Sequence, residues 1–423
     1  GGMQFTGAVS VLGGTGGTTN TLTLHTRGTV TQDSGANIAA DGLQLLGTGG
    51  IFNLENTGNA VATLAGNTGT VSFGENSDFA IGSVGATTGL TTSGNLTLTT
   101  TGTVTQSQNI AASGLRLIGT GTYTLSRTSN SISTLAANTG TLTFAQNTAY
   151  TVGTVTTVGI TTTGNLSLSG TAGYTLAQNI SSGAGTQTYT GPITLSTGAI
   201  TLTATNADIT FSGSTTTING AQALTINAGT GTIAFGGVVG GTIAISSLEL
   251  QGSGSNTLPS AITASGAIDL KGSSRTNTLA AATTLTSNSA GTITLGNTNG
   301  AYALSISNGA GIIDLATIGS TTNLASLTLF GTGINQLRGS ITTTGAIDLK
   351  GTSRTTQLFF SPTITASNAN VTIGTIDGGT GTTAGTYSLT IANGSGTITL
   401  GNVGGTIALY ELTLTGTGNT VVG

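Results

Sequence analysis

The sequence predicts an all-β chain that folds as a parallel β-helix, a solenoid forming a single elongated rod. Three observations support this fold class: short runs with period-two alternation, glycine-rich breaks between the runs, and long internal repeats. The composition agrees, because 71 of the 423 residues are glycine, only 3 are proline and 36% are hydrophobic. Collagen would need far more proline, and a disordered chain would be poorer in apolar residues.

Alternation of apolar and polar residues marks the expected strands. Runs such as Ile200–Thr203 and Leu248–Leu250 alternate in this way, which is the pattern of a half-buried strand. The glycine, asparagine and serine residues between runs supply the backbone angles and turns that sharp corners need. Because a few short strands cannot bury a core alone, successive coils must stack on one another.

Repeats in the first half of the chain have a period of about 70 to 74 residues. The segment Gly28–Gln32 returns as Gly102–Gln106, and Gly42–Gly49 returns in closely similar form as Gly114–Gly121. We therefore expect residues 1–190 to form one β-solenoid segment built from this longer unit.

The second half repeats with a longer period. Gly266–Gly272 recurs as Gly345–Gly351, and Val239–Ala244 recurs as Val403–Ala408 at roughly twice that offset. We expect residues 191–423 to continue the solenoid with repeats of about 79 to 85 residues.

The alternation also predicts which side chains face the core. A coil of roughly 20 to 25 residues would give about 17 to 21 coils. Apolar residues at alternate positions should be buried and the charged residues between them exposed. The residues expected inside are Leu117, Ile268, Leu270, Ile347 and Leu349, and those expected outside are Asp269, Lys271, Asp348 and Lys350.

Charge and hydropathy exclude several partners. The 8 Lys and Arg against 12 Asp and Glu form no basic stripe, so we expect no nucleic-acid partner. No stretch approaches the roughly 18 consecutive apolar residues of a transmembrane helix, so no transmembrane segment is expected. The absence of cysteine removes disulfides and thiolate metal sites.

The sequence contains no pattern typical of catalysis, and we expect no enzyme, cofactor or metal site. His25 is the single histidine and is expected to be an exposed strand residue. The acids show no singular carboxylate pair of the kind that glycosidases use. Gly13–Gly17 is rich in glycine but lacks the Lys and Ser or Thr of a phosphate loop, and Asp377–Gly379 is interpreted as a turn.

One polar constellation occurs twice and is the candidate surface contact site. Its residues are Asp269, Lys271 and Arg275, with copies at Asp348, Lys350 and Arg354. Since residues two apart on a strand share a face, Asp and Lys should project outward together. The set is either a solvated surface pair or a repeated contact site for a neighbouring rod or an anionic glycan.

The coil segments resemble those of a known family. The segment Thr163–Leu168, with the sequence TGNLSL, the Val-Gly-Gly-Thr segments and the Gly-Thr-Val-Thr-Gln segments resemble the shafts of filamentous-haemagglutinin-like exoproteins and autotransporter passengers. The resemblance implies a right-handed β-helix secreted by bacteria and placed outside the cell or on its surface. It implies a non-catalytic adhesin shaft, and the alternative is a structural protomer of a self-assembling fibre, sheath or matrix. We expect neither the family's secretion-directing N-terminal domain nor its pore domain within these 423 residues, and the export route stays open.

The two ends of the sequence both fall within a repeat. Phe5–Val9, Gly16–Thr18 and Leu22–Leu24 resemble an internal coil, and Leu412–Gly418 matches Leu327–Gly333 without the coil that should follow. We therefore expect either a window on a longer chain or a protomer that associates with itself, end to end or laterally. Contact with a glycan or a host surface stays open.

Overall fold

The computed structural model describes residues 2–12, 20–379 and 385–423 and is a parallel β-solenoid of about 18 turns. These ranges contain strands and turns but no helix, and so none long and apolar enough to span a membrane. The predicted all-β, parallel β-helical fold is confirmed, and the number of turns lies in the predicted range. The contacts divide the chain into two compact units, Gly1–Thr205 and Asn206–Gly423. The division at residue 190 that the repeats suggested stays a prediction.

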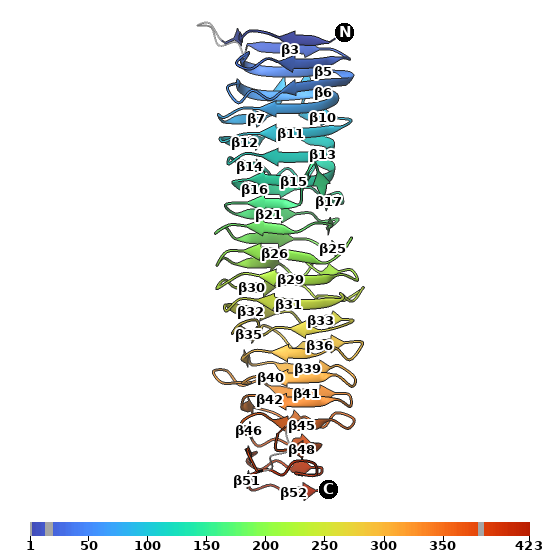
Figure 1. The fold of residues 1–423 in the computed structure, drawn as a ribbon, viewed down its shortest axis with the longest axis vertical. Helices are drawn as coiled ribbons and strands as arrows, with labels where there is room; N and C mark the ends of the chain where they lie inside the picture. The colour runs from blue at the N-terminus through green and yellow to red at the C-terminus, as the bar shows by residue number, and fades with distance from the viewer. Residues whose placement is uncertain (1, 13–19, 380–384) are drawn as a thin grey trace. The chain divides into compact units, whose positions relative to one another are not determined.

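The strands of the first unit are mostly short, and four of them are long because they continue around corners (Figure 1). In chain order they are β1 (Met3–Phe5), β2 (Val9–Val11), β3 (Thr21–His25), β4 (Thr29–Gln32), β5 (Ile38–Leu54), β6 (Ala60–Gly74), β7 (Phe79–Ile81), β8 (Ser83–Val84), β9 (Thr87–Thr88), β10 (Leu90–Thr92), β11 (Asn95–Thr99), β12 (Thr103–Gln106), β13 (Ile110–Ile118), β14 (Thr122–Leu125), β15 (Ser131–Thr139), β16 (Thr141–Ala145), β17 (Tyr150–Val152), β18 (Thr154–Val155), β19 (Thr157–Val158), β20 (Ile160–Thr162), β21 (Leu166–Ser169), β22 (Tyr174–Leu176), β23 (Ile180–Ser182), β24 (Gln187–Thr190), β25 (Ile193–Leu195) and β26 (Ile200–Ala204).

The second unit contains short strands throughout. They are β27 (Ile209–Ser212), β28 (Ile218–Asn219), β29 (Ala223–Asn227), β30 (Ile233–Phe235), β31 (Ser247–Gln251), β32 (Ser255–Leu258), β33 (Ala261–Ala264), β34 (Ile268–Asp269), β35 (Thr276–Leu279), β36 (Thr283–Ser287), β37 (Ile293–Leu295), β38 (Thr298–Asn299), β39 (Ala303–Ser307), β40 (Ile312–Leu315), β41 (Ser326–Phe330), β42 (Ile334–Leu337), β43 (Ile341–Thr343), β44 (Ile347–Asp348), β45 (Thr355–Leu358), β46 (Thr363–Ala366), β47 (Val371–Ile373), β48 (Thr375–Asp377), β49 (Ser388–Ala392), β50 (Ile398–Leu400), β51 (Glu411–Thr415) and β52 (Thr420–Val422).

Each turn of the second unit contributes one strand segment to each of three faces, and the segments of one face pair in parallel with those of the next turn. Face 1 consists of β29, β31, β34, β37, β40, β42, β45 and β48. Face 2 consists of β27, β30, β32, β35, β38, the bridge residue Ile318, β43, β46, β49 and β51. Face 3 consists of β28, the bridge residue Val239, β33, β36, β39, β41, β44, β47, β50 and β52.

The core follows the alternation seen in the sequence. All five residues predicted to be inside are at most 1% exposed, so this part of the register is confirmed. Lys350 is exposed as predicted, whereas Asp269, Lys271 and Asp348 are half-buried. Their outward orientation agrees with the alternation, but strands of the turns above and below, each about 4.8 Å away, cover part of each side chain.

In the first unit, one long strand pairs with several shorter strands of the preceding turn. Strand β5 pairs with β2 through Ile38–Ala40, with β3 through Gly42–Leu46 and with β4 through Ile51–Asn53. The register of β5 with β6 shifts between Gly47 and Ile51, where Gly47 has a positive φ of 124°. Glycine tolerates this backbone conformation, so the strand bends around the corner and resumes its pairing with β6 at Ile51.

Two antiparallel hairpins interrupt the parallel solenoid, and the sequence patterns did not predict them. They are β8–β9 and β18–β19, at equivalent places in the two repeats of the first unit. Val84 and Val155 in these hairpins are buried, and each packs over a glycine, Gly42 or Gly114. A Cβ at Gly42 would lie 2.8 Å from Val84 Cγ1, so the glycine makes room for the hairpin.

Exposed Asn and Asp side chains connect the corners of adjacent turns. In each case a side-chain oxygen accepts a hydrogen bond from a backbone amide about one turn later, which satisfies an amide that the corner leaves without a strand partner. Examples are Asp78 with Thr103, Asn165 with Thr186, Asn206 with Thr230, Asp208 with Thr232 and Asn370 with Thr397.

In three loops of the second unit, one Asn or Asp side-chain oxygen accepts hydrogen bonds from two backbone amides instead of one. The loops are Gly240–Ala244, Gly319–Asn323 and Gly404–Ala408, and each begins with a glycine whose φ lies between 68° and 74°. One oxygen of an Asn or Asp from an earlier turn accepts bonds from two successive amides in each loop. The pairs are Asn219 with Thr242 and Ile243, Asn299 with Thr321 and Thr322, and Asp377 with Thr406 and Ile407.

Candidate functional site

The two arginines of the predicted contact site lie in the core. Arg275 is 1% exposed and Arg354 is 0% exposed, so the prediction that they belong to a surface site is wrong. The alternation is broken by a tight turn: the amide of Arg275 donates to the carbonyl of Lys271, and Gly272 has a φ of 51°. Counting alternate positions through this turn therefore assigns the wrong face to Arg275 and to its copy.

The guanidinium of Arg275 binds acceptors on the two preceding turns and so joins them to its own turn. All five hydrogen bonds go to carbonyl or carboxamide oxygens. Nε donates to Oδ1 of Asn256 (2.5 Å), Nη1 to the carbonyls of Gly229 (3.3 Å) and Gln251 (3.0 Å), and Nη2 to those of Gly231 (2.8 Å) and Ser255 (2.7 Å).

Arg354 repeats this arrangement in the next copy of the sequence repeat. Its donors reach Asn335 Oδ1 (2.5 Å), Asn308 Oδ1 (2.9 Å) and the carbonyls of Gly309 (3.3 Å), Phe330 (3.0 Å), Gly311 (2.8 Å) and Ile334 (3.0 Å). Burial lowers the pKa of each arginine to about 10, so both remain charged at neutral pH. We call each arginine with its acceptors an arginine clamp, because it ties three turns together through oriented dipoles.

A buried asparagine chain extends the first clamp along face 2. Asn256 Nδ2 donates to Asn277 Oδ1 at 2.8 Å, and Asn277 Nδ2 donates to Thr298 Oγ1 at 3.2 Å. Sequence reasoning missed Asn256 and its copy Asn335, because asparagine was assigned to corners. The available signal was the spacing of these two asparagines, which equals the spacing of the two arginines.

The aspartates of the predicted site close turns in the backbone. Asp269 Oδ1 accepts the amide of Lys271 at 2.9 Å, and Asp348 Oδ1 accepts the amide of Lys350 at 2.9 Å. These bonds, between a side chain and the backbone two residues on, account for the two aspartates without a ligand. A contact role for the Asp and Lys side chains stays a prediction.

The structure does not bring the two copies of the predicted site to one face. Ile268 lies on face 1 and pairs with Ile293, whereas Ile347 lies on face 3 and pairs with Val371. Along the chain from β34 to β44 there are three full turns and two further segments. Asp269 and Asp348 therefore project from different faces and cannot form a repeated patch along one side of the unit.

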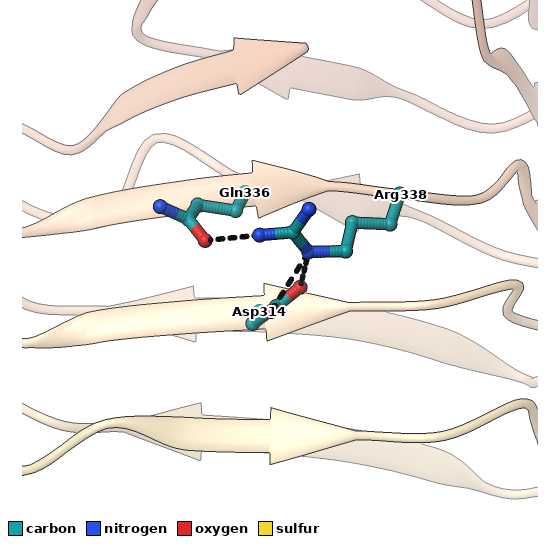
Figure 2. Close-up of polar contacts among 3 residues, drawn as sticks. All are labelled: Asp314, Gln336 and Arg338. Atoms are coloured by element: carbon teal, nitrogen blue, oxygen red, sulfur yellow. Dashed lines mark hydrogen bonds and ion pairs between the residues drawn. The ribbon is translucent and has the colours of Figure 1, made fainter. Parts of the chain in front are cut away.

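A different polar cluster lies on face 1 and its edge (Figure 2). Arg338 Nε contacts both carboxylate oxygens of Asp314, at 2.8 and 2.9 Å, and Nη2 donates to Gln336 Oε1 at 3.0 Å. The guanidinium carbon also lies 4.0 Å from the ring centroid of Phe359. These contacts join β40, β42 and the residue after β45. The side chain of Arg338 is 38% exposed, which is the setting in which an ion pair stabilises little.

A shallow groove of about 520 Å³ crosses face 2 near the start of the second unit. Small and apolar residues form it, and the stacked rings of Phe211 and Phe235, with centroids 5.1 Å apart, lie beneath it. The groove has no charged residue in its lining. It can therefore offer shape and apolar contact to a ligand, but no ionic contact from its own wall.

The residues weighed for catalysis and metal binding lie apart. His25 is exposed on β3, as expected. The described ranges hold no group of three or more His, Cys, Asp or Glu side chains placed to bind a metal ion. Asp377 ends β48 and supports the loop Gly404–Ala408, whereas Gly13–Gly17 falls outside the described residues.

One buried acid was missed by sequence reasoning. Glu75 is 1% exposed, and burial raises its pKa from the ordinary value of 4.5 to about 7. Both of its oxygens accept the amide of Val61 at 3.0 Å, and Oε1 accepts the hydroxyl of Ser77 at 2.5 Å. The signal was present in the repeat, where the equivalent residue is Gln146.

Most of the polar groups described above join one turn to another, through arginine clamps, asparagine chains and corner contacts. The β-solenoid fold agrees with the resemblance to filamentous-haemagglutinin-like exoproteins at the level of architecture. No protein-family model, curated protein or solved structure matches the chain.

Proposed function

We propose that the chain is the non-catalytic, extracellular β-solenoid shaft of a bacterial surface adhesin or exoprotein. In this role it holds a binding part of the same protein away from the cell. The arginine clamps carry the proposal, because each places a rare charged residue where it binds three turns together. A shaft must resist separation of its turns, and buried hydrogen bonds to a charged group are among the strongest polar contacts available for this.

The composition of the exposed surface supports the same role. Outward strand positions hold mainly Thr, Ser and Asn, and the corners are joined by Asn and Asp side chains, so the surface is hydrated and nearly uncharged. Such a surface limits nonspecific association with charged partners. A spacer between a cell and a distant target benefits from this property.

Immunogold electron microscopy on cells that make the protein tests the proposal. Two exposed sites suit antibody epitopes: the hairpin that contains Val158, which is 61% exposed, and the loop that contains Ile243, which is 52% exposed. The shaft role predicts that intact, unpermeabilised cells are labelled at both sites. Labelling that requires permeabilisation contradicts it.

The alternative is a structural protomer of an extracellular fibre, sheath or matrix. The same micrographs separate the two, because an adhesin shaft gives isolated labelled projections and a protomer gives an ordered polymer. In either role the purified chain should release no reducing sugar from a panel of polysaccharides. Sugar release at a rate proportional to protein concentration would overturn the non-catalytic part of the proposal.

A further inference from the structure

Glu75 and Gln146 occupy equivalent positions in the two repeats of the first unit, and each is 1% exposed. Gln146 makes a reciprocal contact with one backbone residue. Its Oε1 accepts the amide of Ile132 at 2.7 Å, and its Nε2 donates to the carbonyl of Ile132 at 2.9 Å. The position is therefore built for a side chain with one acceptor and one donor.

A glutamate meets this requirement only when it carries a proton. In Glu75 both oxygens lie 3.0 Å from the amide nitrogen of Val61, the residue equivalent to Ile132. An ionised carboxylate has no donor for the carbonyl of Val61, whereas the neutral acid has one hydroxyl donor and one acceptor, as the glutamine amide does. Protonation thus restores the contact that Gln146 makes permanently.

We propose that Glu75 is a proton-responsive latch: the protonated side chain binds both the amide and the carbonyl of Val61 at the start of β6, and the ionised side chain keeps the amide but loses the carbonyl. The latch joins the end of β6 to its beginning, since Glu75 follows Gly74 and contacts Val61. It also lies directly before β7 and the β8–β9 hairpin, so opening it releases the segment that leads into the hairpin.

Burial is what favours the neutral acid at Glu75, and the hydrogen bonds from the Ser77 hydroxyl and the Val61 amide act in the opposite direction. Of the strands packed against β6, β5 carries Asp41, while β7, β8, β9, β10 and β11 carry no charged residue. The flanking segments carry Glu55 and Asp78. These three residues are acidic, and no Lys, Arg or His lies on any of these strands or in these segments to stabilise an ionised carboxylate.

The direction of the pH dependence follows from linkage. Burial raises the pKa of Glu75 to about 7 in the folded chain, from its ordinary value of 4.5, so the folded state binds this proton more tightly than the unfolded state. The contribution to stability is complete below pH 4.5 and is lost as the pH rises through 7. Acidification within this window should therefore tighten the first repeat.

The test combines two reciprocal variants with a direct titration. Glu75→Gln copies the second repeat and should flatten the thermal unfolding midpoint of the full chain between pH 4.5 and 7, relative to wild type. Gln146→Glu installs a second acid in the equivalent site and should steepen the same dependence. In wild type, carbon-detected NMR should show one glutamate carboxyl, identified by its loss in Glu75→Gln, titrating near pH 7.

A carbonyl chemical shift supplies a local readout. The carbonyl carbon resonance of Val61 in wild type should shift as the pH rises through 7, because the hydroxyl donor to that carbonyl is lost, while that of Ile132, which keeps its donor from Gln146, should not change. A Glu75 carboxyl that titrates near pH 4.5, or a Glu75→Gln variant with the wild-type pH dependence, overturns the proposal. If a variant fails to fold, the wild-type titration alone decides, with the Glu75 carboxyl then assigned through its correlation to the Glu75 backbone.

Discussion

Arg275 and Arg354 are equivalent residues of successive repeats, yet they clamp different faces of the same unit. Arg275 donates to Asn256 on face 2, whereas Arg354 donates to Asn335 on face 1. The first unit behaves in the same way. Leu96 is stacked in one series with Leu115 and Leu135. Its copy Leu166 is stacked with Leu142 and Tyr123, which form a different series of the same unit. In both units the sequence repeat thus spans a whole number of strand segments without spanning a whole number of turns.

Replacement of a clamp arginine should be strongly destabilising. Arg275→Met keeps much of the side-chain volume but leaves buried carbonyl oxygens without donors, so the free energy of unfolding should fall by about 3 kcal/mol. Urea unfolding followed by circular dichroism measures the change. The matched control is Arg338→Met, which removes an arginine that is 38% exposed and should cost less than about 1 kcal/mol. Equal losses in the two variants would contradict the clamp.

Removal of the Tyr150 hydroxyl should leave stability unchanged or raise it by about 1 kcal/mol. This hydroxyl is buried without a hydrogen-bond partner among the described residues, and its repeat equivalent is Phe79. Tyr150→Phe is therefore expected to keep or raise the thermal midpoint. Tyr123→Phe is the control, because the Tyr123 hydroxyl lies 2.7 Å from the Ile118 carbonyl and its loss should lower the midpoint. The idea fails if Tyr150→Phe is the more harmful change.

A glycine should fit the tip of the second hairpin better than the threonine found there. Thr156 has a φ of 64°, a left-handed conformation that is costly for a β-branched residue, and its repeat equivalent is Gly85. Thr156→Gly should raise the free energy of unfolding by about 0.5–1 kcal/mol, as measured by urea unfolding. The reciprocal change, Gly85→Thr, should lower it. Changes of the same sign in both variants would rule out backbone strain as the cause.

The loop contacts of the second unit predict a tolerated change of charge. Asn299 holds its loop through one side-chain oxygen, and Asp377 fills the equivalent role in the last copy. Asn299→Asp keeps the acceptor and should preserve the thermal midpoint, whereas Asn299→Ala removes it and should cost about 1 kcal/mol. Thermal unfolding of both variants at neutral pH gives the comparison. A loss in Asn299→Asp as large as that in Asn299→Ala would show that the oxygen is not the important group.

The sequence predicts the core of this fold well because alternation acts locally. Ile268 and Leu270 are buried as expected, since on a short strand each side chain faces away from its neighbours. Alternation fails to predict the burial of Arg275, because a tight turn separates this residue from Leu270. The geometry of that turn, and not strand geometry, sets the direction of the Arg275 side chain. The face assignments of Asp269 and Asp348 also needed the number of segments per repeat, which the repeat length alone does not fix.

The buried acid could have been suspected from the repeat but not interpreted. An alignment of Glu75 with Gln146 shows a change between two residues of nearly equal shape. Its meaning depends on the approach of both side chains to the backbone of a residue 14 positions earlier. Nothing in the local sequence indicates that contact.

The three-and-two-thirds-turn repeat of the second unit bears on how such a chain can grow during evolution. A tandem duplication of one such repeat inserts whole strand segments, so every new strand finds a partner and the junction stays in register. Each new copy is nevertheless rotated by one face, and the original orientation returns only with every third copy. Surface changes carried by duplication are thereby distributed around the axis of the unit. A uniform binding stripe along one side would instead have to arise by separate substitutions in each copy.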